Sequence, residues 1–183
     1  DGSNGHAWAE PAGSPDKDYA SAAPAWSPDG RRLAFSHQLC PYPGQACVRV
    51  IAIMEETGTI TDLTPPDPDA YDSNPTWSPD GRRIAFLRAP LLGRPADSLG
   101  VHRIYIYHLY VVNADGSGLR RLTRNWTYPG QVKQVVWSPD GRTIYFLSTR
   151  SGSSQVWRLN LAGGDPVQVT RLPVDVGAFV MAP

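Results

Sequence analysis

Short apolar runs, each about five residues long and bounded by tight-turn sequences, dominate the chain. Runs such as "RLAFS", "RIAFL" and "TIYFLS" alternate apolar and polar positions or stay apolar throughout, as strands in packed sheets do. No window shows the apolar i, i+3, i+4, i+7 spacing of a surface helix. The pattern therefore predicts an all-β chain of short strands joined by turns.

One five-residue word, "WSPDG", precedes three of these runs, at Trp26–Gly30, Trp77–Gly81 and Trp137–Gly141. Aligned on the tryptophan, the chain divides into three repeats, over residues 23–64, 74–123 and 132–170. Each repeat contains four apolar runs, so the pattern predicts one four-stranded unit for each copy.

Every residue of the word has a structural explanation. In Ser-Pro-Asp-Gly, proline fixes φ at the second position of a type I turn, aspartate tolerates the third, and glycine adopts the left-handed conformation. The preceding tryptophan is a large apolar plug between neighbouring sheets. These roles fall on Trp26, Pro28, Asp29, Gly30, Trp77, Pro79, Asp80, Gly81, Trp137, Pro139, Asp140 and Gly141. A competing interpretation brings Asp29, Asp80 and Asp140 together on a metal ion, but turn aspartates usually bond to their own backbone.

The pattern "PxWSPDGRRIAF…IYVVNADGSGLRRLT" resembles the repeat of TolB-type β-propellers, in which each unit is one four-stranded antiparallel blade. The match recurs three times from residue 23 onward. The resemblance implies three blades, either half of a six-bladed ring or a fragment of a larger propeller. It implies no single function, because such propellers include periplasmic TolB, domains of prolyl-oligopeptidase-like enzymes and uncharacterised secreted proteins.

Three blades are fewer than the roughly four to eight that close a propeller ring, so two sheet edges stay open. Residues 177–183, "GAFVMAP", resemble the first strand of a further blade, with Met181 in place of tryptophan. Residues 1–22 contain a candidate second strand near Trp8. We expect the C-terminal strand, with Phe179, to lie beside the N-terminal segment of another copy, giving a six-bladed dimer or an open filament. A chain cut between repeats is the remaining interpretation.

Charge and hydropathy exclude some classes of partner. The 17 basic residues balance the 17 acidic ones, so no general attraction to nucleic acid or anionic lipid is expected. No apolar run approaches the roughly 18 residues that span a bilayer, and the opening "DGSNGHAWAE" is not a signal segment. We therefore expect protein partners, without nucleic acid and without a direct membrane span.

Two cysteines, Cys40 and Cys47, flank the turn-like sequence "PYPGQA". A hairpin there would bring the two thiols within disulfide range, whereas two free buried thiols are the alternative. A disulfide implies an oxidising compartment. Together with the family resemblance, it predicts a periplasmic or secreted protein.

The sequence offers no candidate for catalysis. It lacks a Gly-x-Ser-x-Gly nucleophile elbow, a phosphate-binding loop and a zinc signature. Its cysteines and histidines are too few and too scattered for Cys–His catalysis. We therefore predict no catalytic residue, no cofactor and no metal ligand.

Loops between blades are better candidates for binding, because they gather at the ends of a propeller and carry variable residues. Three segments stand out, 65–74, 89–100 and 124–131, each of which could instead pack on its own blade. Aromatic and arginine side chains are enriched at protein interfaces, and the leucines of 89–100 fall outside any strand pattern. The candidate partner-binding residues are Arg124, Trp126, Tyr128, Tyr71, Leu91 and Leu92.

We therefore expect a non-catalytic interaction or scaffold module that assembles with another copy or joins a larger extracytoplasmic complex. One alternative is the propeller of a prolyl-oligopeptidase-like serine peptidase whose catalytic domain lies outside this chain. Another is a site for a small ligand or a cation in the propeller channel.

Overall fold

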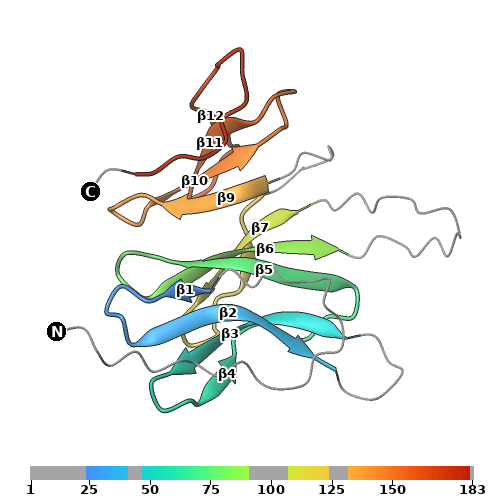
Figure 1. The fold of residues 1–183 in the computed structure, drawn as a ribbon, viewed down its shortest axis with the longest axis vertical. Coiled ribbons are helices and arrows are strands. Elements are labelled where there is room, and N and C mark those ends of the chain that lie inside the picture. Colours follow the sequence, from blue (N-terminus) through green and yellow to red (C-terminus); the bar gives the residue numbers. More distant parts are fainter. Residues whose placement is uncertain (1–23, 41–46, 91–106, 124–131, 182–183) are drawn as a thin grey trace, which may run out of the picture.

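The structure of the protein is a computed structural model that describes residues 24–40, 47–90, 107–123 and 132–181. These residues form twelve β-strands and no helix, so the predicted all-β class is confirmed. The part of the chain described by the structure accordingly holds no helix able to cross a membrane. The strands form three consecutive antiparallel units of four strands, which we call blades 1, 2 and 3 (Figure 1).

The strands follow the chain order within each blade. Blade 1 contains β1 (Ala25–Trp26), β2 (Arg32–Leu39), β3 (Val48–Glu55) and β4 (Ile60–Asp62). Blade 2 contains β5 (Ala70–Trp77), β6 (Arg83–Pro90), β7 (His108–Asn113) and β8 (Arg120–Arg121). Blade 3 contains β9 (Val132–Trp137), β10 (Thr143–Ser148), β11 (Gln155–Asn160) and β12 (Val167–Gln168).

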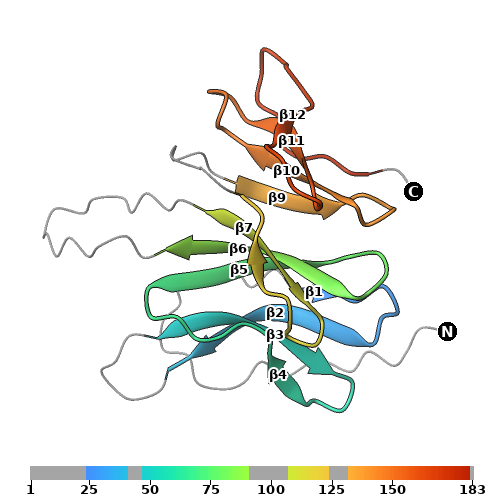
Figure 2. The ribbon, with the colours of Figure 1, turned by 180° about the vertical axis from the view of Figure 1, so that it is seen from behind.

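Blade 2 lies between the other two, and the three sheets stack as successive layers (Figures 1 and 2). A single parallel bridge, between Arg49 of β3 and Tyr71 of β5, joins the sheets of blades 1 and 2. We call the packed layer between blades 1 and 2 the first seam and that between blades 2 and 3 the second seam. Blades 1 and 3 each keep an outer face that no other described blade covers.

Strand periodicity distributes the side chains of blade 2 between the two seams. Ile84 and Phe86 belong to the apolar cluster of the first seam, whereas Ala85 and Leu87 belong to that of the second, because successive side chains of a strand point to opposite faces. The first cluster comprises Ala34, Ile51, Ile53, Leu63, Trp77, Ile84, Phe86 and Val112. The second comprises Ala85, Leu87, Leu109, Val111, Leu122, Val132, Trp137, Ile144, Phe146, Leu159 and Leu161. Full burial of one large apolar side chain contributes about 1.5–3 kcal/mol, so these seams supply the core.

Blade 2 begins earlier than the repeat pattern indicates. The segment 65–74 reads as a connecting loop, with the second unit beginning at residue 74, but β5 already begins at Ala70. Ala70, Tyr71 and Asp72 pair with the far end of β6 across a register shift. Long-range pairing therefore extends the strand into a sequence that is locally typical of turns.

Candidate protein-interaction surfaces

The three WSPDG words form the same turn. The Gly30 amide donates to the Ser27 carbonyl at 2.9 Å, and glycine φ values of 72°, 65° and 64° place each word's last residue in the left-handed region. The corresponding bonds in blades 2 and 3 are also 2.9 Å long, from Gly81 to Ser78 and from Gly141 to Ser138. Proline, aspartate and glycine thus serve the turn at each site.

The aspartates of the words bond within their own turns. The Ser78 hydroxyl donates to Asp80 at 2.6 Å, and the Arg82 amide donates to the same carboxylate at 3.1 Å. The serine hydroxyl is the largest cause of a lowered pKa at all three positions, Asp29, Asp80 and Asp140. Among the described residues, no group of three or more His, Cys, Asp or Glu side chains could hold a metal ion.

Two of the three tryptophans of the words pack on the preceding blade. The Trp77 indole donates to the Ala25 carbonyl of blade 1 at 2.9 Å, and the Trp137 indole donates to the Thr76 carbonyl of blade 2 at 3.1 Å. These two side chains are 7% and 5% exposed, whereas Trp26 of blade 1 is 50% exposed. The same word therefore has two environments, set by whether a described blade precedes it.

An arginine of the preceding blade clamps each buried tryptophan. Arg32 lies over the Trp77 ring, with its Cζ atom 4.7 Å from the centroid, and donates to the Gly81 carbonyl at 3.2 Å. In the second seam the corresponding separations are 5.2 and 3.1 Å, for the set Arg83, Trp137 and Gly141. The clamp thus joins two blades through a cation–π contact and a hydrogen bond.

Successive turns also touch directly. A Cβ atom built on Gly81 would lie 3.7 Å from Pro28 Cδ, and one on Gly141 would lie 3.7 Å from Pro79 Cδ. A larger residue than glycine would approach the neighbouring turn there, besides being strained at positive φ. Glycine is therefore required in blades 2 and 3 for its conformation, while an added Cβ would meet the neighbouring turn at an ordinary van der Waals distance.

The outer face of blade 3 exposes an apolar residue whose counterparts in the other two blades are buried. Val169 is 47% exposed, whereas Leu63 and Leu122, at the corresponding positions of blades 1 and 2, are 5% and 9% exposed. Val167 on β12 is also exposed. Beside it lies a cleft of about 290 Å³ lined by Thr143, Arg158, Asn160, Gly163, Asp165 and Val167.

The C-terminal segment runs back along blade 3. The Gln134 side chain of β9 donates to the Phe179 carbonyl at 2.7 Å and accepts from the Phe179 amide at 3.1 Å. The Val176 amide donates to the Ser154 carbonyl at 2.7 Å, and the Ser154 amide donates to Asp175 at 2.6 Å. The segment forms no strand, but its backbone lies beside the start of β11, much as β5 lies beside β3.

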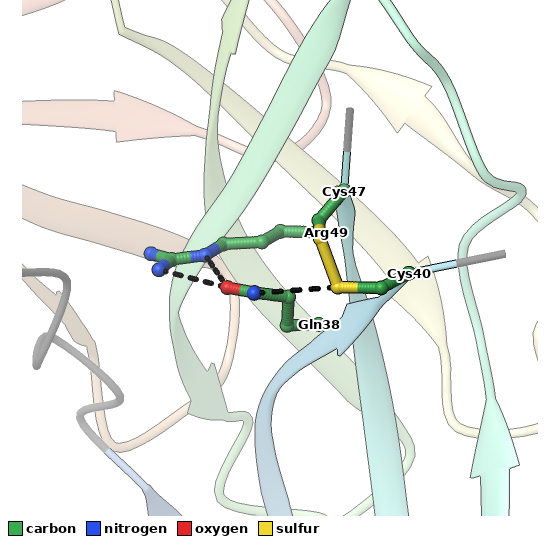
Figure 3. Close-up of a disulfide and its surroundings, with 4 residues drawn as sticks. All are labelled: Gln38, Cys40, Cys47 and Arg49. Carbon is green, nitrogen blue, oxygen red and sulfur yellow. Dashed lines mark hydrogen bonds between the residues drawn. A yellow bond between two sulfur atoms is a disulfide. The ribbon is translucent and has the colours of Figure 1, made fainter. Parts of the chain in front are cut away.

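Cys40 and Cys47 form a disulfide, with an S–S distance of 2.03 Å, at the ends of β2 and β3 (Figure 3). The Gln38 amide nitrogen lies 3.5 Å from the Cys40 sulfur, and its oxygen accepts from the Arg49 guanidinium at 3.3 and 3.2 Å. The bridge therefore closes the outer end of this hairpin, and polar side chains surround it.

The structure places Tyr71 in β5 rather than in a connecting loop. Its backbone pairs with Ala89 of β6 and bridges to Arg49 of β3, whose guanidinium lies 6.0 Å from the tyrosine ring centroid. The ring is half-buried at the junction of blades 1 and 2. As a candidate partner contact, Tyr71 offers only part of its surface.

A buried ion pair follows Tyr71. The Asp72 carboxylate is 1% exposed and accepts from Arg88 at 2.6 and 2.7 Å and from the Thr64 hydroxyl at 2.6 Å. Burying a charge is costly unless it is fully paired, and these bonds satisfy both carboxylate oxygens. In blade 3 the corresponding strand pair is Val132 and Ser148, so blade 3 lacks this ion pair.

His108 is the one histidine with a marked pKa shift among the described residues. Burial, and then the nearby Arg121 guanidinium, lower the pKa of His108 to about 4. The Arg121 Nη2 atom lies 3.0 Å from the His108 Nδ1 atom. At neutral pH the imidazole is therefore uncharged, and it can accept this hydrogen bond.

Six predicted contact residues lie outside the described ranges: Arg124, Trp126, Tyr128, Leu91, Leu92 and Trp8. The structure also brings into the seams residues that sequence reasoning did not single out. The arginines of the clamp are Arg32 and Arg83. Each is the second residue after the glycine of its word. A threonine ending each blade accepts a backbone amide at 2.9 to 3.1 Å, and the three are Thr64, Thr123 and Thr170. Their signal was the repeated "LT" or "VT" at the end of each repeat.

Comparisons with known proteins give relatives of two kinds, a peptidase and TolB. No family model matches the chain. Over 159 residues, 85% of this chain, it is 28% identical to dipeptidyl-peptidase 5 of Porphyromonas gingivalis, 22% of which is covered. Over 124 residues, 50% of this chain, it is 32% identical to the Tol-Pal system protein TolB of Bordetella pertussis, 28% of which is covered.

A solved structure shows the same likeness in three dimensions. A structure described as a TolB protein of Agrobacterium tumefaciens matches 80% of this chain with a TM-score of 0.53 and 28% identity. The match covers 45% of that structure, so the chain spans less than half the length of each of these three proteins.

Proposed function

We propose that the chain, a TolB-like β-propeller, is a non-catalytic protein-interaction or scaffold module that binds through the outer faces of blades 1 and 3. The observation that carries this proposal is the contrast between corresponding residues. Trp26 and Val169 are about half exposed, whereas their counterparts inside the seams are nearly buried. Apolar surface of this kind is stabilised by burial against a partner.

The proposed partner is a protein chain, either another copy or a subunit of a larger assembly. In the first arrangement, residues 177–183 of one copy lie beside residues 1–22 of another and together build a composite blade. The bonds between Gln134 and Phe179 support this arrangement, because they hold the C-terminal segment along the edge of blade 3. Likeness over half of the chain to TolB, which is named as a protein of the Tol-Pal system, supports a place in a larger assembly.

We place the protein outside the cytoplasm, in the periplasm or secreted. The support is the Cys40–Cys47 disulfide, a bond that persists in oxidising compartments and is rare in reducing ones. Fractionation of expressing cells, with thiol labelling before and after reduction, tests this placement. Recovery with both thiols free from a reducing compartment contradicts it.

The mass of the protein in solution tests the proposed assembly. Light scattering after gel filtration at micromolar concentration should give a dimer or larger species, and removal of residues 177–183 should shift it to monomer. A matched control, Val174→Ser, changes an exposed apolar side chain outside residues 177–183 and should leave the mass unchanged. A monodisperse monomer for the intact chain contradicts assembly with a second copy.

A second candidate is the propeller of a serine peptidase. The observation in its favour is the likeness to dipeptidyl-peptidase 5 over 85% of this chain. A Gly-x-Ser-x-Gly elbow encoded in the same reading frame, and labelling of the native product by a fluorophosphonate probe, would support it. A native product of 20 kDa that the probe does not label would exclude it.

A further inference from the structure

The two seams use one set of contacts, with the contributing residues at fixed positions of the repeat. The earlier blade supplies an arginine, a proline and a backbone carbonyl, whereas the later blade supplies the tryptophan and the glycine. The donors and acceptors cannot be exchanged between the two sides. Each seam therefore has a direction, from an arginine-bearing blade to a tryptophan-bearing blade.

Blade 1 presents the complete accepting half of such a seam on its outer face. Trp26 is half exposed, and Gly30 has φ +72°, as in the two buried words. Among the described residues, no atom lies within 4 Å of a Cβ built on Gly30. Leu33 and Met54 pair with each other on this face and are only partly buried. We call this surface, Trp26, Gly30, Leu33 and Met54, the Trp26 face.

Blade 3 does not present the matching half. The position of Arg32 and Arg83 is occupied by Thr143, so no guanidinium stands at the clamp position for an incoming tryptophan. Arginine supplies a planar, delocalised cation with several donors, which threonine cannot replace. The outer face of blade 3 therefore lacks the residue that both existing seams use.

Two further positions oppose the standard packing. Tyr145 occupies the place of Ala34 and Ala85, both wholly buried, and a tyrosine would overfill a seam packed that closely. Arg158 occupies the place of Ile53 and of its counterpart in blade 2, so docking an apolar face there would strip water from a charge. The Trp26 face of a second copy is therefore a poor partner for blade 3.

The sequence of the chain's own ends does not place an arginine at the clamp position either. If Asp1 and Gly2 complete a word after Pro183, the position of Arg32 falls on Asn4. Both clamp arginines of the chain, Arg32 and Arg83, are already engaged inside the seams. Among the described blades, none therefore presents the complement of the Trp26 face.

We infer that the Trp26 face is the docking surface for a blade of the same repeat type that presents arginine at the position of Arg32 and Arg83, and that blade 3 of a second copy cannot take this part. The inference rests on the proposed function, since it names the chemistry of the partner at one of the two proposed faces. It follows from continuity with the seams inside the chain, where the same interface occurs twice.

Grafting the outer face of blade 2 onto blade 3 tests this inference in the full chain. The graft is Thr143→Arg with Tyr145→Ala and Arg158→Val, which copies Arg83, Ala85 and Val111. Sedimentation velocity over a concentration series should show head-to-tail association of the graft at least about tenfold tighter than any association of the wild type. Adding Trp26→Ala to the graft should abolish the gain.

Matched variants distinguish association through the clamp from nonspecific association. The same graft with lysine at residue 143 keeps the charge but not the planar guanidinium, and should lose most of the gain. A parallel series carries Gln134→Ala, because the C-terminal segment otherwise occupies the approach to blade 3. Thr143→Arg alone serves if the triple variant does not fold, and circular dichroism establishes folding in each case.

Two outcomes overturn the inference. One is a folded graft that associates no more tightly than the wild type in either series. The other is wild-type association that Trp26→Ala abolishes, because a second copy would then meet the requirement without arginine. A third outcome separates the two proposals. If the wild type binds no partner and stays monomeric while the graft associates through Trp26, the proposed assembly is contradicted. The inference about the arginine–tryptophan contact is then still supported.

Discussion

The three tryptophans of the WSPDG words provide a comparison at the scale of single residues. They share their sequence neighbours, yet Trp77 and Trp137 are almost buried and donate hydrogen bonds to the preceding blade, while Trp26 is half exposed. The energetic value of the same side chain therefore depends on the blade before it.

Trp77→Ala should lower the free energy of unfolding by about 3–5 kcal/mol, the usual range for removing a buried aromatic side chain. The loss combines the cavity in the first seam, the hydrogen bond to Ala25 and the contact with Arg32. Trp26→Ala is the matched control and should cost much less, because half of that side chain is already exposed to solvent. Urea unfolding of the two variants measures the difference, and equal losses would contradict the seam assignment.

Asp80 gives a prediction for pH. The Ser78 hydroxyl is the main cause that lowers the pKa of Asp80 below 3.8 in the folded protein, so the folded state binds this proton less tightly than the unfolded state does. The resulting stability is fully present above the unfolded pKa and is lost as the pH falls through the folded pKa. Asp80→Asn should therefore reduce stability at pH 6 and flatten its decline below pH 4.

Urea unfolding of Asp80→Asn and wild type from pH 2 to pH 7 measures both effects. Ser78→Ala removes the main hydrogen bond while keeping the carboxylate, and should flatten the decline in part. If the free energy of unfolding declined equally below pH 4 in all three proteins, the turn carboxylate would not contribute to the pH dependence of stability.

At the scale of elements, the local sequence is enough to predict a structure that is formed by a few neighbouring residues. Pro79, Asp80 and Gly81 predicted the turn because each acts on its own backbone. The strand around Tyr71 was not foreseen, because "PPDPDAYDSN" is locally typical of a turn and its pairing partners lie far along the chain. Local sequence does not predict the arginine clamp for the same reason, because Arg32 and Trp77 come into contact only when the blades stack.

The seam pattern predicts a coupling between blade 3 and the C-terminal segment. Thr143 and Met181 stand where the two seams have arginine and tryptophan. Thr143→Arg together with Met181→Trp should rebuild the clamp and slow amide hydrogen exchange at Val176 and Phe179, by about tenfold for a clamp worth 1–2 kcal/mol.

Each single change should do little, so the effect should appear as non-additivity in a double-mutant cycle. Thr143→Lys with Met181→Trp is the control for charge alone. Additive effects across the cycle would mean that the C-terminal segment does not take the place of a first strand.

At the scale of the whole molecule, stability is arranged as a row of neighbours. Blade 3 packs against blade 2 through β9, and among the described residues blades 1 and 3 share no seam. Such an arrangement allows an end blade to open while the others stay folded. Blade 2, with a seam on each side, should be the last to open.

Trp137→Ala weakens only the second seam and should therefore act on one blade. Amide exchange should accelerate by about a hundredfold over β9 to β12. The reason is that the variant lowers the free energy needed to open blade 3 by about 3 kcal/mol. Exchange in β2, β3 and β6 should change little. Uniform acceleration through all three blades, read by mass spectrometry of peptic peptides, would instead indicate a single cooperative unit.

The direction of the seams has a consequence for how such a protein can grow. Blade 2 brings Trp77 for the arginine before it and Arg83 for the tryptophan after it. A duplicated blade 2 would consequently fit beside its parent with both junctions intact, whereas a duplicated blade 3 would bring Thr143 and interrupt the series. Gene duplication can thus lengthen the stack by copies of blade 2 with the clamp kept, whereas a copy of blade 3 interrupts it.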